Sequence, residues 1–324
     1  MPLYQSNKVE ISKKIKEFCF EAGFDAVGIS QAKELNTSKE NLSKWLENNY
    51  NASMQYMANN LDKRANPTLL FENCKSIISL AINYYTPITF NSKNQYAISK
   101  YALGKDYHFI IKEKLHSIIK HISELTGIET HRGFVDSAPV FERTLAVEAG
   151  LGWIGKNSCL IIPQKGSFYF LAEIYSTLEL EYDNPFLENH CGNCSKCIEA
   201  CPTKAIVAPG VIDSQKCISC LTIESKDDLP ESIAQLANNQ IFGCDICQDV
   251  CPHNLKFAKT SYGQHFKPIK QILNLNISDW EVMNENEFNC IFKKAQSPLA
   301  RSGYGKIMRN IKAYKNGEEI QSGW

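Results

Sequence analysis

The stretch Cys191-Gly-Asn-Cys-Ser-Lys-Cys-Ile-Glu-Ala-Cys-Pro202 spaces four cysteines as C-x2-C-x2-C-x3-C-P. This spacing is typical of bacterial two-cluster iron–sulfur proteins, in which the first three thiolates bind one 4Fe–4S cubane and the fourth binds its neighbour. A second run, Cys244-Asp-Ile-Cys-Gln-Asp-Val-Cys-Pro252, repeats the later half of the motif, with Ile241 in the place of its first cysteine. Together the two runs predict two clusters in one small domain.

The spacing also predicts which thiols bind which cluster. Two cubanes need eight of the nine cysteines between Cys191 and Cys251. One predicted ligand set is Cys191, Cys194, Cys197 and Cys251. The other is Cys201, Cys244, Cys247 and either Cys217 or Cys220, and spacing alone does not choose between those two. The alternatives are inert cysteines or zinc, although zinc ribbons use two C-x2-C pairs without the C-x3-C-P ending.

Composition limits the class of protein. The chain has 324 residues, of which 44% are hydrophobic, with 35 basic and 35 acidic side chains. This apolar fraction excludes a wholly disordered chain, and the length allows two or three domains. The apolar runs are too short to span a membrane, and residues 1–6 lack a signal-peptide pattern, so we expect a cytoplasmic protein without membrane contact. The balanced charge argues against a strongly basic nucleic-acid coat.

Before the cysteine runs, the pattern alternates between helix and strand. We predict helices over 9–22, 106–125 and 139–149, strands over 25–30, 76–83 and 128–135, and a hairpin of 158–162 with 167–175. This alternation predicts an α/β (α+β) domain over 1–178. An acidic stretch then leads into a ferredoxin-like two-cluster domain over 179–257. A short helical segment follows over 258–324.

Two further patterns have competing interpretations. The segment 291–316 carries seven basic and no acidic side chains, which indicates either a solvated helix face or a phosphate-binding patch. The stretch Gly150 to Lys156 formally matches G-x-G-x-x-G and nearly a P-loop. A helix precedes it where a strand is required, so we reject both nucleotide motifs. We interpret its glycines as a tight turn that allows close backbone approach to a ligand.

Several motifs in chain order resemble the epoxyqueuosine reductase family. Beyond the cysteine runs and Thr203–Ile206, they are VDSAPVFER at 135–143, AGLGWIGKNS at 149–158, CISCLTIE at 217–224, GCDICQ at 243–248, and SPLARSGY at 297–304 followed by Arg309-Asn310. The resemblance implies a cobalamin in the N-terminal domain. It also implies the last step of queuosine synthesis, the reduction of epoxyqueuosine to queuosine at the wobble position of tRNA. This reaction takes two electrons and two protons.

The resemblance implies roles for individual residues. Asp136 occupies the family's proton-donor position, and its apolar neighbours at 134–135 and 138–140 lead us to expect a raised carboxyl pKa. The alternative is an ordinary helix N-cap before Pro139. Arg143 would orient Asp136, bind a phosphate or form a surface salt bridge. The positions that match cobalamin contacts are Arg64, Ser99, Asp136, Leu160, Leu171, Ser219 and Asp245. The family usually has an aromatic residue at position 220, which implies that Cys217 is the ligand.

The resemblance also implies partners. We expect tRNA carrying epoxyqueuosine, a one-electron donor such as ferredoxin or flavodoxin, and a monomer. Many family members continue into C-terminal helical repeats that help to bind tRNA. We therefore expect tRNA contact here to rest on the core and on the basic 291–316 segment, with weaker and more salt-sensitive binding. Two alternatives are a reductive dehalogenase-like enzyme, which would usually carry an export signal, and an electron-transfer protein without its own reaction.

Overall fold

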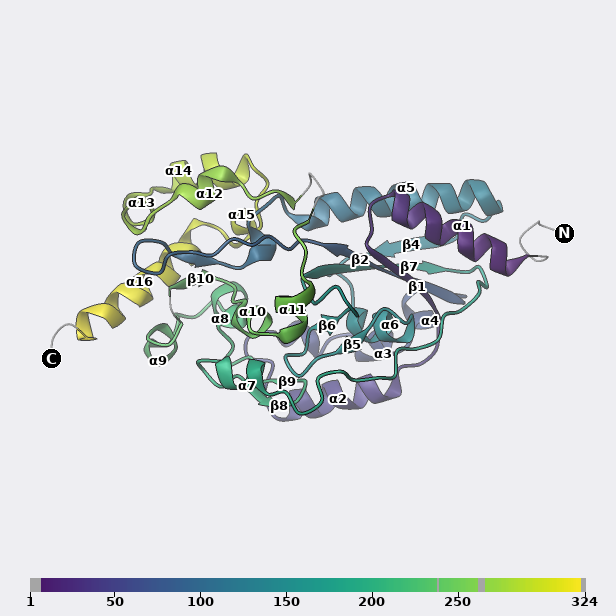
Figure 1. Cartoon of the computed structure of the whole chain (residues 1–324), viewed down its shortest axis with the longest axis horizontal. Coiled ribbons are helices and arrows are strands. Elements are labelled where there is room, and N and C mark those ends of the chain that lie inside the picture. The colour runs from purple at the N-terminus through teal and green to yellow at the C-terminus, as the bar shows by residue number, and fades with distance from the viewer. Residues whose placement is uncertain (1–6, 238, 262–265, 322–324) are drawn as a thin grey trace.

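The computed structural model describes residues 7–237, 239–261 and 266–321, with only the backbone for 316–321. A sheet with helices on both sides forms one half of the molecule, and a mostly helical body that includes the C-terminal helices forms the other half (Figure 1). The region with the cysteine runs lies along one side, where the two halves meet. The mixed α/β class expected from the sequence is confirmed.

The central sheet has four strands in the order β1-β2-β7-β4, and all neighbouring strands are antiparallel. Their bounds are β1 Ala26–Gln31, β2 Ser76–Asn83, β7 Tyr169–Ser176 and β4 His131–Phe134. Every residue of β2 is buried, as its continuous apolar run predicts for a strand with neighbours on both sides. The antiparallel pairing makes this an α+β sheet rather than a parallel one.

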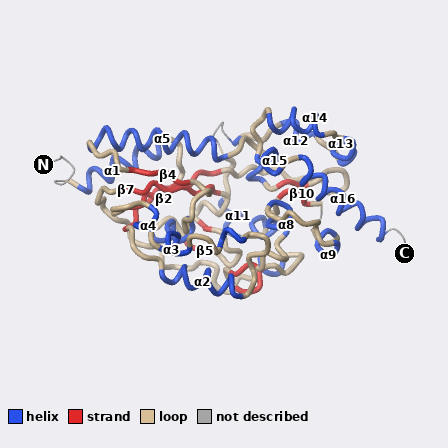
Figure 2. Tube along the Cα trace, turned by 180° about the vertical axis from the view of Figure 1, so that it is seen from behind, coloured by secondary structure: helices blue, strands red, loops and turns tan. Residues whose placement is uncertain are grey.

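Helices cover both faces of this sheet. Helices α1 (Lys8–Glu21) and α5 (Tyr107–Thr126) lie along one face, and Figure 2 shows them on the same side of the strands. Asp106 caps α5 by accepting the His108 N–H at 3.0 Å, and Gly127 ends the helix in the left-handed region, as the sequence predicts. The short helix α6 (Glu142–Glu148) packs on the opposite face, against β1, β2 and β7.

The hairpin predicted for 158–162 and 167–175 is wrong in its pairing. Its turn forms, with a bridge between Ile162 and Gly166. However, β6 (Leu160–Ile161) pairs with β5 (Trp153–Ile154) instead of β7. A Cβ at Gly152 would stand 2.1 Å from the Ile161 carbonyl oxygen, so glycine is required for this pairing. The interpretation of Gly152 as a point of ligand approach is therefore wrong, because the backbone that approaches it belongs to the chain itself.

The cysteine-rich region is built from short elements. They are α7 (Lys196–Ala200), β8 (Ile206–Ala208), β9 (Val211–Ile212), α8 (Ile218–Ile223), α9 (Glu231–Ala234), β10 (Gln240–Phe242), α10 (Ile246–Asp249) and α11 (Pro252–Phe257). Strands β8 and β9 form a small hairpin. Cys217 precedes α8 and Cys251 precedes α11 as their N-cap residues.

A second hydrophobic core crosses the expected domain boundaries. Strand β3 (Ala97–Ile98) pairs in parallel with β10. Along the chain, the later part of the N-terminal domain and most of the cysteine-rich region lie between these two strands. The C-terminal elements pack on this pair: α12 (Lys270–Asn274), α13 (Ile277–Val282), α14 (Glu285–Phe288), a π turn at Asn289–Lys293, α15 (Pro298–Ser302) and α16 (Tyr304–Gln321). Trp280, Phe242 and Leu103 are all buried in this core. The helical 258–324 segment is thus part of a shared body.

Other elements connect these parts. They are α2 (Asn36–Glu47), α3 (Leu61–Ala65), α4 (Pro67–Leu70) and short 3-10 turns at Gln55–Met57 and Lys100–Ala102. Trp45 of α2 donates a hydrogen bond to the Ile212 carbonyl, which ties this helix to the cysteine-rich region. Within the described ranges, no helix combines the length and the apolar character needed to cross a membrane.

Candidate active site

Asp136 stands at the centre of a three-residue turn just beyond the end of β4. The Ser137 N–H donates to the Val135 carbonyl at 2.5 Å, and Asp136 has a φ of +52°. A tight turn of this kind with positive φ is strained for a residue other than glycine. Strain of this type is common where a side chain must be aimed into a functional site. Helix α6 begins only at Glu142, so Asp136 is not its N-cap and the helix predicted from 139 starts later.

Two residues of α5 bind the Asp136 carboxylate. Tyr107 donates its hydroxyl to Asp136 Oδ2 at 2.5 Å, and His108 Nε2 lies 3.5 Å from the same oxygen. The other ring nitrogen, Nδ1, lies 2.8 Å from Asp106 Oδ1. The side chain of Asp136 remains 54% exposed. The carboxylate is therefore held in place and still accessible to a ligand.

The pKa of Asp136 is lowered, which corrects the expectation of a raised pKa. The hydrogen bond from His108 lowers the pKa and outweighs desolvation by burial, and Tyr107 acts in the same direction. Burial lowers the pKa of His108, but its hydrogen bonds to Asp106 and Asp136 outweigh burial and raise it overall. Both shifts favour a protonated His108 beside an ionised Asp136.

Arg143 does not contact Asp136 and instead binds the loop after β5. Its guanidinium donates to the Ser158 carbonyl, and to the Ser158 hydroxyl at 2.6 Å. The structure thus gives Arg143 a loop-binding contact. The residue of the same motif that does reach the turn is Glu142, whose Oε1 accepts the Asp136 N–H at 2.7 Å.

The basic C-terminal segment divides into two kinds of contact. Arg301 reaches back to α5, with Nη1 2.9 Å from His108 Nδ1 and 3.8 Å from Asp106 Oδ2. Arg309 donates to the Leu221 and Ser225 carbonyls at 3.1 and 2.9 Å, and Lys306 donates to the Ile223 carbonyl. These carbonyls lie at the C-terminal end of α8, where cations stabilise a helix. Part of the basic segment therefore supports the fold.

The residues expected to contact cobalamin fall into local groups around Asp136. Leu160 and Leu171 belong to one apolar cluster beside α6. The Ser99 hydroxyl hydrogen-bonds the buried Asp245 carboxylate, and burial raises the pKa of Asp245 to about 6 despite the nearby Lys100. Ser219 is half-buried in the first turn of α8. Asp136 and Asp245 both act electrostatically on Tyr101, so this side chain lies within electrostatic range of both carboxylates.

Arg64 offers an unused donor beside Asp136. Its Nε is buried and has no hydrogen-bond partner among the described residues. Its Nη1 reaches only the Val140 carbonyl, at 3.4 Å. Tyr56 lies within electrostatic range of both Arg64 and Asp136, because the charges of both side chains act on the Tyr56 hydroxyl. A buried guanidinium N–H without a partner fits a ligand that carries hydrogen-bond acceptors, such as the amide side chains of a corrin ring.

One set of predicted cluster ligands lines a single cavity. Cys191, Cys194, Cys197 and Cys251 surround a space of about 130 Å³ together with side chains from the loop after β5 and from the start of α11. Trp153 Nε1 lies 3.5 Å from Cys191 Sγ. Among the described residues, no three His, Cys, Asp or Glu side chains converge closely enough for a single metal ion. Four thiols around one cavity are suited to a polynuclear cluster, in which each thiolate binds a different iron.

The second set of thiols lies together near α8 and α10. Cys244 is under the electrostatic influence of Cys217 and Cys201, and Cys247 under that of Cys244 and Cys217. The backbone amides of Cys220 and Ser219 point at the Cys217 sulfur. Amide donors of this kind stabilise a thiolate at a helix N-terminus. The Cys220 thiol is buried, is under the electrostatic influence of Cys217, and acts in turn on Tyr56, on which Asp136 acts as well.

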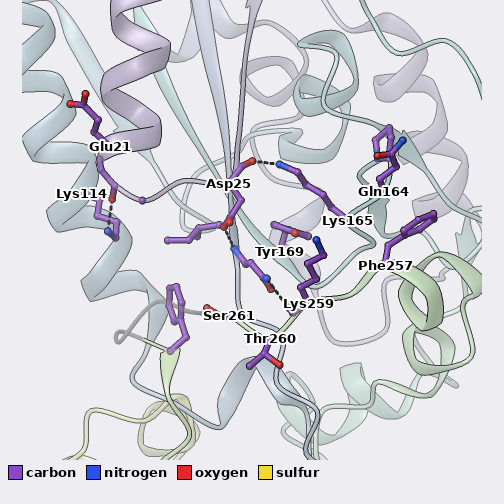
Figure 3. A pocket seen from close by; sticks show the side chains of 16 residues that line it. Glu21, Asp25, Lys114, Gln164, Lys165, Tyr169, Phe257, Lys259, Thr260 and Ser261 are labelled. Carbon is purple, nitrogen blue, oxygen red and sulfur yellow. Dashed lines mark hydrogen bonds between the residues drawn. The ribbon is translucent and has the colours of Figure 1, made fainter.

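A larger cavity, of about 760 Å³, lies away from all of these residues. Figure 3 shows its lining, with Lys165 hydrogen-bonded to Asp25 and with Lys114 near the end of α1. Lys114 donates to the Ala22 carbonyl at 2.5 Å, and Lys165 donates to the Asp25 carbonyl. None of the residues expected in the site lines this cavity. Its size alone therefore does not make it the active site.

Sequence reasoning missed several residues that contact Asp136 or lie beneath it. They are Tyr107, His108, Glu142 and Glu173. Arg301 was considered only as one of the basic residues of 291–316, and its contact with His108 was not predicted. The run Asp106-Tyr-His108 was a usable signal, because a cap residue followed two positions later by histidine brings both side chains to one helix end. No local pattern indicated Glu173, whose proximity depends on the strand order.

Two family models match the chain. The model described as "Epoxyqueuosine reductase QueG, DUF1730" matches residues 64–137, and the model described as "4Fe-4S double cluster binding domain" matches residues 190–254. The first range includes Arg64, Ser99 and Asp136. The second includes both cysteine runs.

Relatives extend the match to nearly the whole chain. An epoxyqueuosine reductase of Cellulophaga algicola is 46% identical over 306 residues, which cover 94% of this chain and 98% of the relative. A crystal structure of an epoxyqueuosine reductase with an epoxyqueuosine-modified tRNA-Tyr stem loop has a TM-score of 0.87 at 28% identity, covering 96% of this chain and 82% of that chain. A Bacillus subtilis epoxyqueuosine reductase, described with its catalytic aspartate loop swung out of the active site, has a TM-score of 0.86 at 28% identity, covering 96% of this chain and 82% of that chain.

A more distant likeness concerns the fold alone. A catabolic reductive dehalogenase has a TM-score of 0.50 at 16% identity and covers 80% of this chain and 34% of that chain. The dehalogenase thus shares the fold of this chain, whereas the higher sequence identities are those to the epoxyqueuosine reductases.

Proposed function

This chain belongs to the epoxyqueuosine reductase family, and on that premise we propose that Asp136 is the acid of a two-electron reduction of epoxyqueuosine to queuosine in tRNA. The observation that carries this assignment is the geometry of Asp136. Its exposed carboxylate is held by Tyr107 at 2.5 Å and by His108 at 3.5 Å, beside a second group of buried polar residues around Asp245.

Three side chains in line form the proton path: Asp106, His108 and Asp136. In it, His108 and Asp136 carry the proton and Asp106 orients His108. Loss of the epoxide oxygen as water consumes two electrons and two protons. Because the pKa of Asp136 is lowered and that of His108 is raised, we assign the proton shared by this pair to His108. His108 passes this proton through Asp136 to the oxygen of the opened epoxide, and solvent supplies the second proton and reprotonates His108. Asp106 keeps the His108 ring oriented through Nδ1.

The cysteine-rich domain supplies the electrons. Cys191, Cys194, Cys197 and Cys251 hold one 4Fe–4S cluster, and Cys201, Cys217, Cys244 and Cys247 hold the other. Asp245, one of the expected cobalamin contacts, acts electrostatically on Cys244 and Cys247 of the second set, so we assign this cluster as the one next to the cofactor. The first set then accepts electrons from a one-electron donor such as ferredoxin or flavodoxin.

Cobalamin is the group that uses these electrons. When bound, it supplies a cobalt centre that collects electrons one at a time and reduces the epoxide with two of them. Arg64, Ser99, Leu160, Leu171, Ser219 and Asp245 hold it beside Asp136. The unpartnered Nε of Arg64 and the apolar pair Leu160 and Leu171 supply the two kinds of contact that a corrin ring with amide side chains needs.

The substrate is a tRNA anticodon loop. Arg301 lies beside His108 at the mouth of the site and is 51% exposed, so it is placed for a phosphate of the wobble region. The other exposed cations of 291–316, including Lys293 and Lys312, add to this contact. We expect the protein to act as a monomer in the cytoplasm, where tRNA is modified.

Anaerobic reconstitution tests the proposal. The chain is loaded with iron, sulfide and cobalamin, reduced, and given an anticodon stem-loop that carries epoxyqueuosine. Mass spectrometry of the digested nucleosides should show the loss of one oxygen, dependent on cobalamin. If clusters and corrinoid bind but the epoxide survives, the substrate assignment is wrong. If no corrinoid binds, an electron-carrier role replaces the reductase role.

A further inference from the structure

A fully buried glutamate lies beneath the Asp136 turn. Glu173 of β7 pairs with Ser79 of β2 on one side and with Phe134 of β4 on the other, so its side chain points to the face covered by α6. Glu173 is 0% exposed, and neither of its carboxylate oxygens has a hydrogen-bond partner among the described residues. The hydroxyls of Ser79 and Ser30, on the same face of the sheet, are also buried and lack partners there.

A carboxyl group in this position must be neutral. An ionised carboxylate without donors in the protein interior costs several kcal/mol or more, and the group takes up a proton instead. Burial raises the pKa of Glu173 well above its ordinary value, and the charges of Glu142 and Asp136 raise it further. Glu173 is therefore a protonated acid at neutral pH.

Glu142 connects this buried acid to the turn. It is the first residue of α6, and its Oε1 accepts the backbone N–H of Asp136 at 2.7 Å. This contact fixes the centre of a strained turn, which would otherwise relax toward ordinary backbone geometry. Burial raises the pKa of Glu142 to about 7, with the negative charge of Asp136 as the next cause.

We propose that Glu142 in its neutral form, beside the neutral Glu173, is the positioning residue that holds the Asp136 turn in place, and that ionisation of Glu142 drives the turn outward. The turn carries the carboxylate of Asp136, so a second negative charge on Glu142 repels it at short range. Glu173 is neutral and therefore supplies no positive charge that could offset the negative charge on Glu142. The effect on reduction rests on the proposed function, whereas the holding of the turn does not.

The sign of the pH dependence follows from the surroundings of Glu142. The ionisable groups that face it come from every element around it: Arg64 of α3, His108 of α5, Asp136 of the turn, Arg143 of α6, and Glu173 and Tyr175 of β7. The cations and the hydrogen bond from the Asp136 N–H favour the ionised form of Glu142, but burial and the negative charge of Asp136 outweigh them. A pKa that is raised while the turn is in place means that holding is complete at low pH and is lost as the pH rises through about 7.

Hydrogen exchange of the Asp136 amide tests this directly. The reconstituted full chain is compared with its E142A, E142Q and E173Q variants from about pH 6 to about pH 8.5, with rates corrected for the intrinsic pH dependence of exchange. In the wild type, the protection of this amide should fall about tenfold over that range. E142A should lack protection throughout, E142Q should keep it throughout, and E173Q should behave as the wild type because a neutral amide replaces a neutral acid.

Controls separate this role from a loss of folding. E148Q changes a glutamate on the same helix that pairs with Lys33 and should leave the exchange of Asp136 unchanged. Protection of the β2 amides and the cluster absorbance report that each variant is folded. Stem-loop reduction by E142A should fall more than tenfold in kcat with KM unchanged, because the acid is misplaced after the substrate has bound.

Specific results would overturn the proposal. They are wild-type protection of the Asp136 amide in E142A, protection in the wild type that does not change with pH, or loss of protection in E142Q equal to that in E142A. If the wild type fails to reduce the stem-loop while the exchange results hold, the proposed function is wrong and the positioning role of Glu142 stands.

Discussion

His108 Nε2 lies 3.5 Å from Asp136 Oδ2, while Asp106 holds the opposite ring nitrogen of His108 at 2.8 Å. The imidazole therefore stands between two carboxylates, one capping α5 and one on a strained turn. Its positive charge is stabilised from both sides, which explains why the pKa of Asp136 is lowered and that of His108 is raised. The titration of Asp136 and His108 is therefore a property of the pair.

Replacing Asp136 by asparagine should remove the acid while leaving the cofactors bound. We expect D136N to lose about 10²- to 10⁴-fold in kcat, the usual contribution of a positioned general acid. The measurement is single-turnover reduction of the epoxyqueuosine stem-loop, with cluster and corrin absorbance recorded for each sample. D62N, a change at an exposed aspartate that pairs with Lys39, is the matched control. Activity in D136N within a factor of two of the wild type would refute the role of Asp136.

Removing His108 should shift the pH profile. Because the pKa of His108 is raised, the wild-type rate should be highest below that pKa and should fall as the pH rises through it. In H108Q only Asp136 can carry the proton, so the fall should begin at lower pH, with a loss of more than about tenfold at neutral pH. Y107F should lose less, because His108 remains. A profile of kcat against pH that is unchanged in H108Q would contradict this account.

The two candidate thiols of the second cluster can be distinguished by iron content. C217S should retain about four irons per chain and C220S about eight, because the backbone amides at the start of α8 point at the Cys217 sulfur. Iron and sulfide analysis with electron paramagnetic resonance of the reduced samples gives the count. The reverse result, with eight irons in C217S, would assign the ligand to Cys220 instead.

The pairing of β5 with β6 depends on the absence of a side chain at position 152. G152A places a Cβ 2.1 Å from the Ile161 carbonyl oxygen, so we expect a loss of about 2–3 kcal/mol in the free energy of unfolding. G305A, in α16 with no atom within 4 Å of the added methyl group, should be neutral or stabilise by up to about 1 kcal/mol. Urea unfolding of both variants measures the difference. Equal midpoints would show that the strand pair tolerates the methyl group.

Much of the fold could be predicted because its signals are local. Strand Ser76–Asn83 is an unbroken apolar run, and helix Tyr107–Thr126 has its cap at Asp106 and its stop at Gly127. The partner of β6 could not be predicted, because Pro163–Gly166 signals a hairpin while the competing pairing depends on space at Gly152. Strand β3 was missed, since its two residues are ordered only by β10, far along the chain.

The candidate site was predictable in its residue types and less so in its electrostatics. The motif that contains Asp136 pointed to an acid, and its apolar neighbours suggested a raised pKa. The pKa of Asp136 is instead lowered by hydrogen bonds from His108 and Tyr107. Both residues belong to α5, so the sequence next to Asp136 could not indicate them. Arg143 shows the same limit, because its partner Ser158 comes from the loop after β5.

The parallel pairing of Ala97–Ile98 with Gln240–Phe242 has a consequence for biosynthesis on the ribosome. The early strand has no partner until the later one emerges, and the core around them is incomplete until Tyr314 follows. All of the cysteines from Cys191 to Cys251 are translated within that interval. Newly made chains thus pass through a stage in which the thiols are synthesised but the helical body that packs beside them is still missing. Delivery of iron and sulfide by an assembly scaffold fits into this stage.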